Sequence, residues 1–140
     1  MTSLVIDGST ALGFVLKDEG DATALATLAE VSNGRRTLVP AHWWVEVANG
    51  LIMAERRKRM TQADTAGAMS LLGKLPVETD METRTHALGE TPALARQYAL
   101  TIYDAAYLEL AMRHGATLAT TDTALAKAAI KAGVDLLTVQ

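Results

Sequence analysis

A short apolar run near the start of the sequence ends at an acidic residue. Residues 4–6 read Leu-Val-Ile and are followed at once by Asp7, Gly8 and Ser9. An uninterrupted run of this kind, rich in β-branched side chains, is typical of a strand buried on both faces of a parallel sheet. Asp7 then lies at the carboxyl end of that strand, the edge where open α/β sheets bind ligands. Gly8 and Ser9 can turn the chain, and we expect Ser9 to cap a helix that begins there.

The rest of the chain alternates between strand-like and helix-like stretches. Strands are predicted at 37–39, marginally at 75–78 because Pro76 disfavours a central strand, at 117–120 and at 135–139. Helices are predicted from Ser9 to about residue 16, at 22–34, at 41–58, after the capping pattern at 61–64, at 81–100, at 102–113 and from Asp122 to Gly133. The helical pattern at 81–100 is broken at Gly89 and at Thr91-Pro92. Residues 17–21 are predicted to form a polar turn. This alternation favours one α/β domain over 1–140, with a mostly parallel central sheet covered by helices on both faces.

Composition narrows the class of protein further. The 140 residues are 49% hydrophobic, carry a formal net charge of −3 and include no cysteine. The negative charge argues against a protein that coats nucleic acid, and the lack of cysteine excludes a disulfide framework and a thiolate metal site or nucleophile. No apolar run approaches the ~20 residues that cross a bilayer, and Asp7 interrupts the first one, so neither a membrane span nor a secretion signal is expected. We expect a cytoplasmic protein.

Four acidic residues stand out because they lie in otherwise apolar segments. Asp7 and Asp122 follow predicted strands, whereas Glu46 and Asp104 lie on predicted helices and share a face with residues that should pack inward. Carboxylates in such places are usually paired, hydrogen-bonded or bound to a metal. Carboxylates that lie close together repel one another, and a divalent cation removes that repulsion. Oxygen ligands favour Mg²⁺ or Mn²⁺, and such a site suits phosphodiester hydrolysis.

Each acid has a simpler explanation when it is considered alone. Asp7 or Asp122 is more often only a helix cap or a turn residue. Capping does not explain inward-facing acids such as Glu46 and Asp104 in the body of a helix. The four acids taken together therefore favour a metal site.

Four segments of the chain carry a resemblance to a known family. They read VIDGS at 5–9, WVEVANGL at 44–51 after Pro40, YDAAYLELA at 103–111, and LATTD at 118–122 with Leu125, Ala128 and Ala129 beyond. In this order, and over nearly the whole chain, they resemble the PIN-domain ribonucleases, specifically the VapC-like toxins of bacterial toxin–antitoxin pairs.

The resemblance implies a role for each matching residue. Asp7, Glu46, Asp104 and Asp122 correspond to the acidic quartet that holds Mg²⁺ or Mn²⁺. Thr120 corresponds to the hydroxyl residue that supports the metal-bound water, although a threonine in a strand is also ordinary. Ser9 and Asn49 correspond to polar residues beside the quartet. Thr10 stands where many relatives carry an apolar residue, and we expect it to weaken the packing of the first helix slightly.

The resemblance also implies an activity and partners. Such proteins are small endoribonucleases that cut structured RNA, such as tRNA or rRNA loops, by metal-assisted attack of water on the phosphodiester. Relatives are homodimers that an antitoxin silences by covering the active-site groove. We assign those contacts to the apolar helix at 41–58 and to the next helix, which carries Met69, Leu71 and Leu72.

Three further groups of residues remain open to more than one interpretation. Arg56, Arg57, Lys58 and Arg59 either steer RNA phosphates or form a solvated helix end that suits the helix dipole. Trp43 and Trp44 are interpreted as core or dimer contacts rather than base-stacking platforms. The three histidines show no metal-ligand spacing and are interpreted as surface or helix-end residues: His42, His86 and His114.

Three rival functions use similar folds. A phosphatase with an aspartyl nucleophile requires a second aspartate two residues after Asp7, where Ser9 stands. A phospho-receiver domain requires a lysine after a late strand, where Asp122 stands. A PIN-fold module that binds but does not cleave remains the non-enzymatic alternative, and the complete quartet argues against it.

Overall fold

The apolar run at the start of the chain forms an inner strand of a parallel sheet. The computed structural model describes residues 1–16 and 22–138, so the turn expected at 17–21 lies outside the described residues. Its four strands are β1 (Leu4–Ile6), β2 (Thr37–Val39), β3 (Val77–Thr79) and β4 (Thr117–Ala119), in the order β3-β2-β1-β4. All of their pairings are parallel, and Ile6 lies opposite Ala119. The mostly parallel sheet is thus confirmed.

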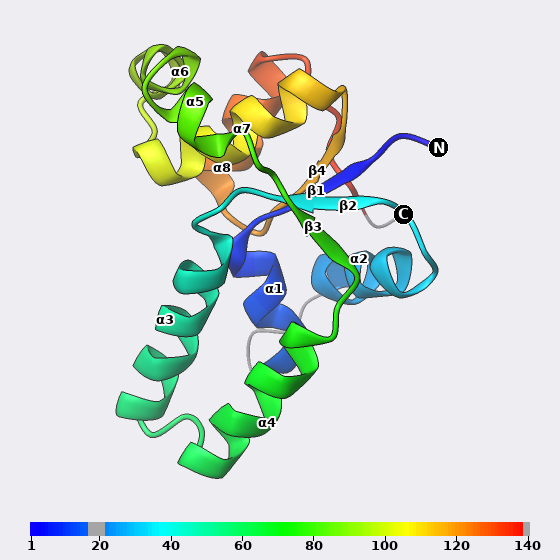
Figure 1. Ribbon diagram of the computed structural model, residues 1–140, viewed down its shortest axis with the longest axis vertical. Coiled ribbons are helices and arrows are strands. Elements are labelled where there is room, and N and C mark those ends of the chain that lie inside the picture. The colour runs from blue at the N-terminus through cyan, green and yellow to red at the C-terminus, as the bar shows by residue number, and fades with distance from the viewer. Residues whose placement is uncertain (17–21, 139–140) are drawn as a thin grey trace.

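Helices cover the sheet on both faces (Figure 1). In that view α1 (Gly8–Val15), α2 (Ala22–Ser32), α3 (Trp43–Arg56) and α4 (Gln62–Gly73) lie below the strands. Above them lie α5 (Thr83–Ala87), α6 (Glu90–Tyr98), α7 (Ile102–His114) and α8 (Thr123–Lys131). No helix in the described part of the chain is long and apolar enough to cross a membrane.

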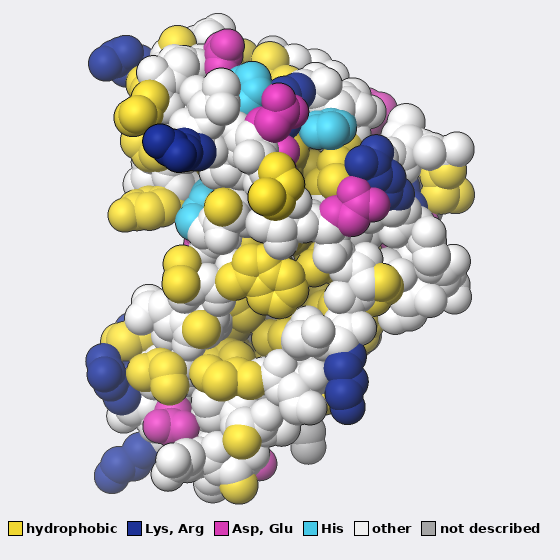
Figure 2. Space-filling model, viewed as in Figure 1, with side chains coloured by type: hydrophobic (Ala, Val, Ile, Leu, Met, Phe, Trp, Pro, Cys, Tyr) yellow, Lys and Arg dark blue, Asp and Glu magenta, His cyan; other side chains and the backbone are white. Residues whose placement is uncertain are grey.

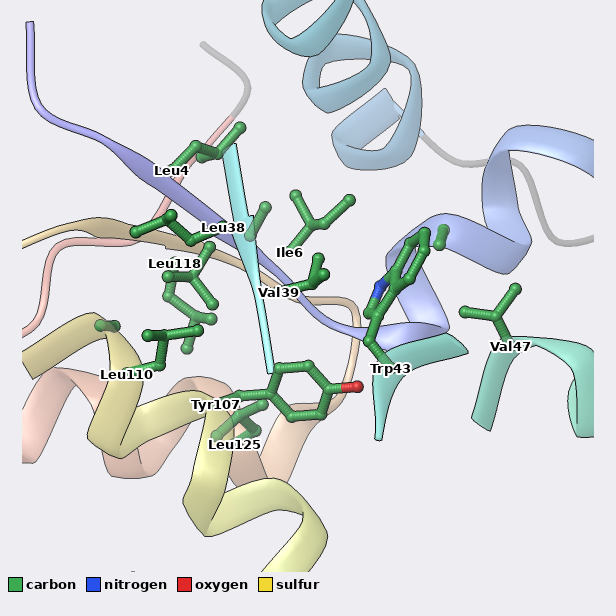
Figure 3. Close-up of a cluster of buried hydrophobic side chains, with 14 of the residues drawn as sticks. Leu4, Ile6, Leu38, Val39, Trp43, Val47, Tyr107, Leu110, Leu118 and Leu125 are labelled. Carbon is green, nitrogen blue, oxygen red and sulfur yellow. The ribbon is translucent and has the colours of Figure 1, made fainter. Parts of the chain in front are cut away.

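The core is built around the strand residues and two aromatic side chains. Leu4, Val5 and Ile6 are completely buried, as the sequence predicts for a strand covered on both faces. Trp43 of α3 and Tyr107 of α7 are also completely buried and reach the same cluster (Figure 3). Burial of each large apolar side chain stabilises the fold by roughly 1.5–3 kcal/mol. The helices that carry Glu46 and Asp104 are therefore anchored to the sheet close to those acids.

Two helix boundaries differ from the prediction. Helix α1 begins at Gly8, and its cap is Asp7 rather than Ser9, because the Asp7 carboxylate accepts a hydrogen bond from the Thr10 N–H at 2.9 Å. The segment at 81–100 breaks at Gly89 only. Pro92 lies inside the first turn of α6, where a proline is tolerated because its missing N–H would have no helical partner.

The strand predicted at 135–139 is wrong. Only an isolated parallel bridge joins Leu118 to Leu136 in the described residues. The Leu118 N–H donates to the Asp135 carbonyl, and the Leu137 N–H donates to the Leu118 carbonyl. The strand with which residues 135–139 would pair, β4, ends at Ala119 and is only three residues long. It therefore offers too few residues for a longer ladder.

Helix α3 is less uniformly covered than its composition suggests. Trp43 and Leu51 are completely buried, whereas Trp44 is 38% exposed and Val45 is 70% exposed. The Trp44 indole N–H donates to the Thr79 hydroxyl at 2.8 Å, which ties the helix to the end of β3. The prediction of a core position is confirmed for Trp43, while Trp44 lies at the surface.

Candidate active site

Asp7 is the most deeply buried of the four candidate acids. It follows β1 directly and is 3% exposed. Its carboxylate accepts hydrogen bonds from the hydroxyls of Ser9, at 2.9 and 3.0 Å, and Thr120, at 2.5 Å, as well as from the Thr10 N–H. Burial raises the pKa of Asp7, although these hydrogen bonds act in the opposite direction. Asp7 is thus fixed in orientation, and no arginine or lysine of residues 1–16 and 22–138 pairs with it.

Glu46 reaches the same region from the first turn of α3. Its side chain is half-buried, and its Oε2 atom accepts a hydrogen bond from the Tyr107 hydroxyl at 3.0 Å. Burial raises the pKa of Glu46, and the charges of Asp104 and Asp7 raise it further. Tyr107, itself fully buried on α7, therefore positions the Glu46 carboxylate from another helix.

Asp104 and Asp122 come from the starts of two later helices. Asp104 lies in the first turn of α7, behind a Thr101 cap, and Asp122 caps α8 by accepting a hydrogen bond from the Leu125 N–H at 2.9 Å. Burial raises the pKa of Asp104, and the charges of Asp122 and Asp7 add to that effect. Asp122 is therefore a helix cap and an electrostatic neighbour of Asp104 at once.

The four acids form one electrostatic group at the carboxyl edge of β1 and β4. Each of them interacts with at least one other, and in the described residues no arginine or lysine forms an ion pair with any of them. No group of three or more His, Cys, Asp or Glu side chains in residues 1–16 and 22–138 is arranged so that it could already hold a metal ion. Whether the site fits a cation therefore depends on the chemistry of the donor atoms, which belong to carboxylates without a counter-charge. Mg²⁺ commonly binds only one or two protein carboxylates directly and keeps several water ligands.

The predicted supporting residues lie beside this group. Thr120 and Ser9 both donate to Asp7, and Ser9 also accepts a hydrogen bond from the Thr121 hydroxyl at 2.9 Å. Asn49 lies one turn after Glu46 on α3 and lines a pocket with it. Thr10 is fully buried, and its hydroxyl donates to the Ala119 carbonyl at 3.2 Å, which joins α1 to β4; the expected slight weakening of the packing of α1 stays a prediction.

Three residues near the acids escaped the sequence interpretation. Tyr107 holds Glu46, as described above, and its position three residues after Asp104 is the signal that points to it. The Nε2 atom of His42 lies 3.5 Å from Glu46 Oε2, so this histidine is a neighbour of the acids as well as a helix-end residue. Gly8 approaches Glu46 so closely that a Cβ atom there would lie 2.8 Å from Glu46 Oε1.

The remaining candidates lie away from the acids. Arg56, Arg57, Lys58 and Arg59 are exposed at the carboxyl end of α3. Ten residues of helix separate Glu46 from Arg56, which corresponds to about 15 Å. His86 contacts Glu90 and Glu109 instead of the candidate site, at distances of 2.7 and 3.6 Å.

Comparisons with known proteins agree on one family. A family model described as PIN domain matches residues 4–131. Ribonuclease VapC3 of Pyrobaculum aerophilum is 27% identical over 124 residues, which cover 89% of this chain and 92% of the relative.

Two solved structures show the same fold. PAE2754 from Pyrobaculum aerophilum matches with a TM-score of 0.67 at 20% identity, over 91% of this chain and 84% of that one. Mycobacterium tuberculosis VapC20, described as a Sarcin-Ricin loop cleaving toxin, matches with a TM-score of 0.59 at 18% identity, over 90% of this chain and 95% of that one.

Proposed function

The chain belongs to the PIN-domain family, and on that premise we propose that it is a Mg²⁺- or Mn²⁺-dependent endoribonuclease, the toxin of a toxin–antitoxin pair. The observation that carries the proposal is the group of four carboxylates at one sheet edge. Neighbouring acids in this group raise the pKa values of Glu46 and Asp104, and no arginine or lysine among the described residues pairs with any of the four. The name of the relative VapC3 supports the choice of RNA as substrate.

Each residue has a distinct part in this proposal. Asp7, Glu46, Asp104 and Asp122 hold the divalent cation, directly or through water. When bound, the cation supplies an activated water and stabilises the charge that develops on the phosphoryl oxygens. Thr120 and Ser9 fix the orientation of the Asp7 carboxylate through their hydroxyls.

The substrate and partners follow the same reasoning. We propose a structured RNA such as tRNA or rRNA as substrate, with the exposed cations at 56–59 attracting its phosphates. The exposed side chains of Trp44, Val45, Met69 and Leu71 on α3 and α4 support contacts with an antitoxin or with a second copy of the chain. Figure 2 shows hydrophobic side chains gathered over these two helices. The protein would act in the cytoplasm.

The test is cleavage of total cellular RNA by the purified chain, free of any antitoxin, in Mg²⁺ or Mn²⁺. Asp7→Asn preserves a side chain that can cap α1 but removes the charge. We expect it to lower the cleavage rate by about a hundredfold or more, as loss of a metal-binding group does. Chelation with EDTA should abolish cleavage by the wild-type protein.

Glu78→Gln is the matched control, because Glu78 is an exposed carboxylate that pairs with Arg36 on the sheet. It should cleave at the wild-type rate. A wild-type chain that cuts no RNA with either ion would instead favour a PIN-fold binding module. A metal-dependent phosphatase would release phosphate from small phosphomonoesters, and that assay separates it from a ribonuclease.

A further inference from the structure

A pocket opens next to two of the acids, between α3 and the start of α7. Its volume is about 440 Å³, and Figure 2 shows the surface hollowed between α3 and the upper part of the molecule. Its walls come from two helices and the turn before α7: His42, Val45, Glu46, Asn49, Thr101, Tyr103 and Asp104. Because Glu46 and Asp104 belong to both, the pocket is continuous with the candidate active site.

Tyr103 is the most unusual residue that lines this pocket, because its aromatic ring is largely exposed. Its side chain is 65% exposed, although it directly precedes Asp104. The His42 ring packs against it in a tilted contact, with ring centroids 5.8 Å apart. Val45, another wall of the pocket, is 70% exposed. An aromatic ring that is supported by a neighbouring ring and otherwise uncovered offers a flat apolar surface to a ligand.

We propose that this pocket binds an unpaired base of the RNA next to the phosphodiester that is cut, with the ring of Tyr103 as the stacking surface. The inference rests on the function proposed above and names the feature of the RNA that this site selects. Proteins recognise unpaired bases by stacking them on tyrosine or histidine, whereas a paired base is held inside the duplex.

The chemistry of the walls fits a base. The exposed Asn49 side chain carries donors and an acceptor that suit the polar edge of a base, while Tyr103 and Val45 suit its faces. A phosphate held near Glu46 and Asp104 leaves the base of its own nucleotide within reach of the pocket. The exposed cations at 56–59 lie at the other end of α3, so the pocket itself recognises the base and not the charge of the backbone.

The experiment compares two RNAs on two proteins. The probes are a fluorescein-labelled single-stranded oligouridylate and its abasic counterpart, which keeps the ribose-phosphate backbone but lacks every base. Both proteins carry Asp7→Asn so that the RNA stays intact, and binding is measured by fluorescence anisotropy in Mg²⁺. Addition of Tyr103→Ala should weaken binding of the oligouridylate about tenfold, as expected for loss of one stacked base, and leave binding of the abasic RNA unchanged.

Two controls complete the design. Tyr103→Phe keeps the aromatic face and should bind both RNAs as Tyr103 does. Leu25→Ala removes an exposed apolar side chain of α2, outside the pocket, and should change neither affinity. If Tyr103→Ala weakens binding of both RNAs equally, or of neither, the pocket does not bind a base. A protein partner would then be the better candidate for its ligand. Absence of RNA cleavage by the wild-type chain tests the proposed function separately, because the binding comparison does not depend on cleavage.

Discussion

Gly8 shows how closely the site depends on a single residue. It follows Asp7 at the start of α1, and its Cα faces the carboxylate of Glu46 on another helix. A Cβ atom at this position would lie 2.8 Å from Glu46 Oε1, closer than real Cβ contacts come, and 3.2 Å from Glu46 Cδ, which is an unusually tight contact. The absence of a side chain at Gly8 is therefore what allows Asp7 and Glu46 to approach each other.

Gly8→Ala should push the Glu46 carboxylate away from Asp7. A misplacement of this size in a catalytic site lowers kcat/KM about 10- to 100-fold. The fold should survive, because the atoms that must move are the end of a half-buried side chain. Measurement of kcat/KM for RNA cleavage, together with the thermal unfolding midpoint, checks both parts.

Gly67→Ala on α4 is the matched control for this change. No atom lies within 4 Å of a Cβ atom at Gly67. This variant should cleave normally and gain about 0.5–1 kcal/mol of stability, the usual advantage of alanine over glycine in a helix. Full activity of Gly8→Ala would show that the Glu46 carboxylate does not need its present position.

At the scale of elements, a network of ion pairs fixes α7 against β3 and α5. The guanidinium of Arg113, near the end of α7, donates to Asp80 at 2.6 and 3.0 Å and to Glu109 at 2.8 and 3.0 Å. Burial raises the pKa of Asp80, but the hydrogen bonds from Arg113, Glu82 and Thr83 outweigh it, so that the net shift is downward. The same helix carries Asp104 and Tyr107 at its other end, so this network also helps to position the site.

Arg113→Leu should destabilise the protein by about 2 to 4 kcal/mol, because it takes the guanidinium away from two nearly buried carboxylates. The side chains of Asp80 and Glu109 are only 6% and 8% exposed. Arg36→Leu breaks a pair of which both side chains are 56% exposed, and it should have a much smaller effect. Urea unfolding of both variants measures the difference, and equal losses would contradict a special role for the Arg113 network.

Local patterns in the sequence predicted the elements well, and long-range contacts explain where they failed. The run at 4–6 and the capping pattern at 61–64 are local signals, and the structure contains the strand and the capping box. Asp7 and Ser9 are both residue types that cap helices, so the local sequence does not decide between them. The choice is made by Thr120, more than a hundred residues away, which together with Ser9 holds the Asp7 carboxylate. No local pattern carries that information.

The limits of the site prediction have the same origin. The spacing of the acids indicated that Asp7, Glu46, Asp104 and Asp122 converge, and the structure brings them into electrostatic contact. The closeness of Gly8 to Glu46 could not be predicted, because it depends on how α1 and α3 pack. The ion pair between Asp80 and Arg113 depends likewise on the docking of α7 against the end of β3.

At the scale of the whole molecule, the candidate site lowers stability at neutral pH. The pKa values of Asp7, Glu46 and Asp104 are raised, chiefly by burial, so the folded state binds protons more tightly than the unfolded state. The stability that protonation gives is complete below the ordinary carboxyl values of about 4, and it is lost as pH rises through the raised values. Asp80 and Glu90 have lowered pKa values, so the stability that they contribute is present above about pH 4 and is lost as the pH falls below that value.

In EDTA the thermal unfolding midpoint should therefore rise as pH falls from 7.5 towards about 5 and drop again below about 4. Asp7→Asn should be more stable than the wild type at neutral pH and should show a flatter profile. A wild-type midpoint that falls steadily from neutral pH downwards would contradict this account of the acids. Differential scanning calorimetry across the pH range measures the midpoints and distinguishes these two outcomes.

Addition of Mg²⁺ or Mn²⁺ should reverse the dependence on pH. Because the cation binds ionised carboxylates, it stabilises the folded state most at neutral and higher pH and least below about pH 4. Asp7→Asn should lose most of this gain. An equal rise of the midpoint in the wild type and the variant would place cation binding elsewhere on the protein.

The position of β1 in the sheet has a consequence for the cell that makes this protein. Strand β1 pairs with β4, the last strand in the described part of the chain, and the acids that surround them lie at residues 7, 46, 104 and 122. A ribosome must therefore have made the chain at least as far as residue 122 before the edge that holds the acids can form. Until that point the four carboxylates cannot come together, so on the function proposed above the growing chain does not yet cleave RNA.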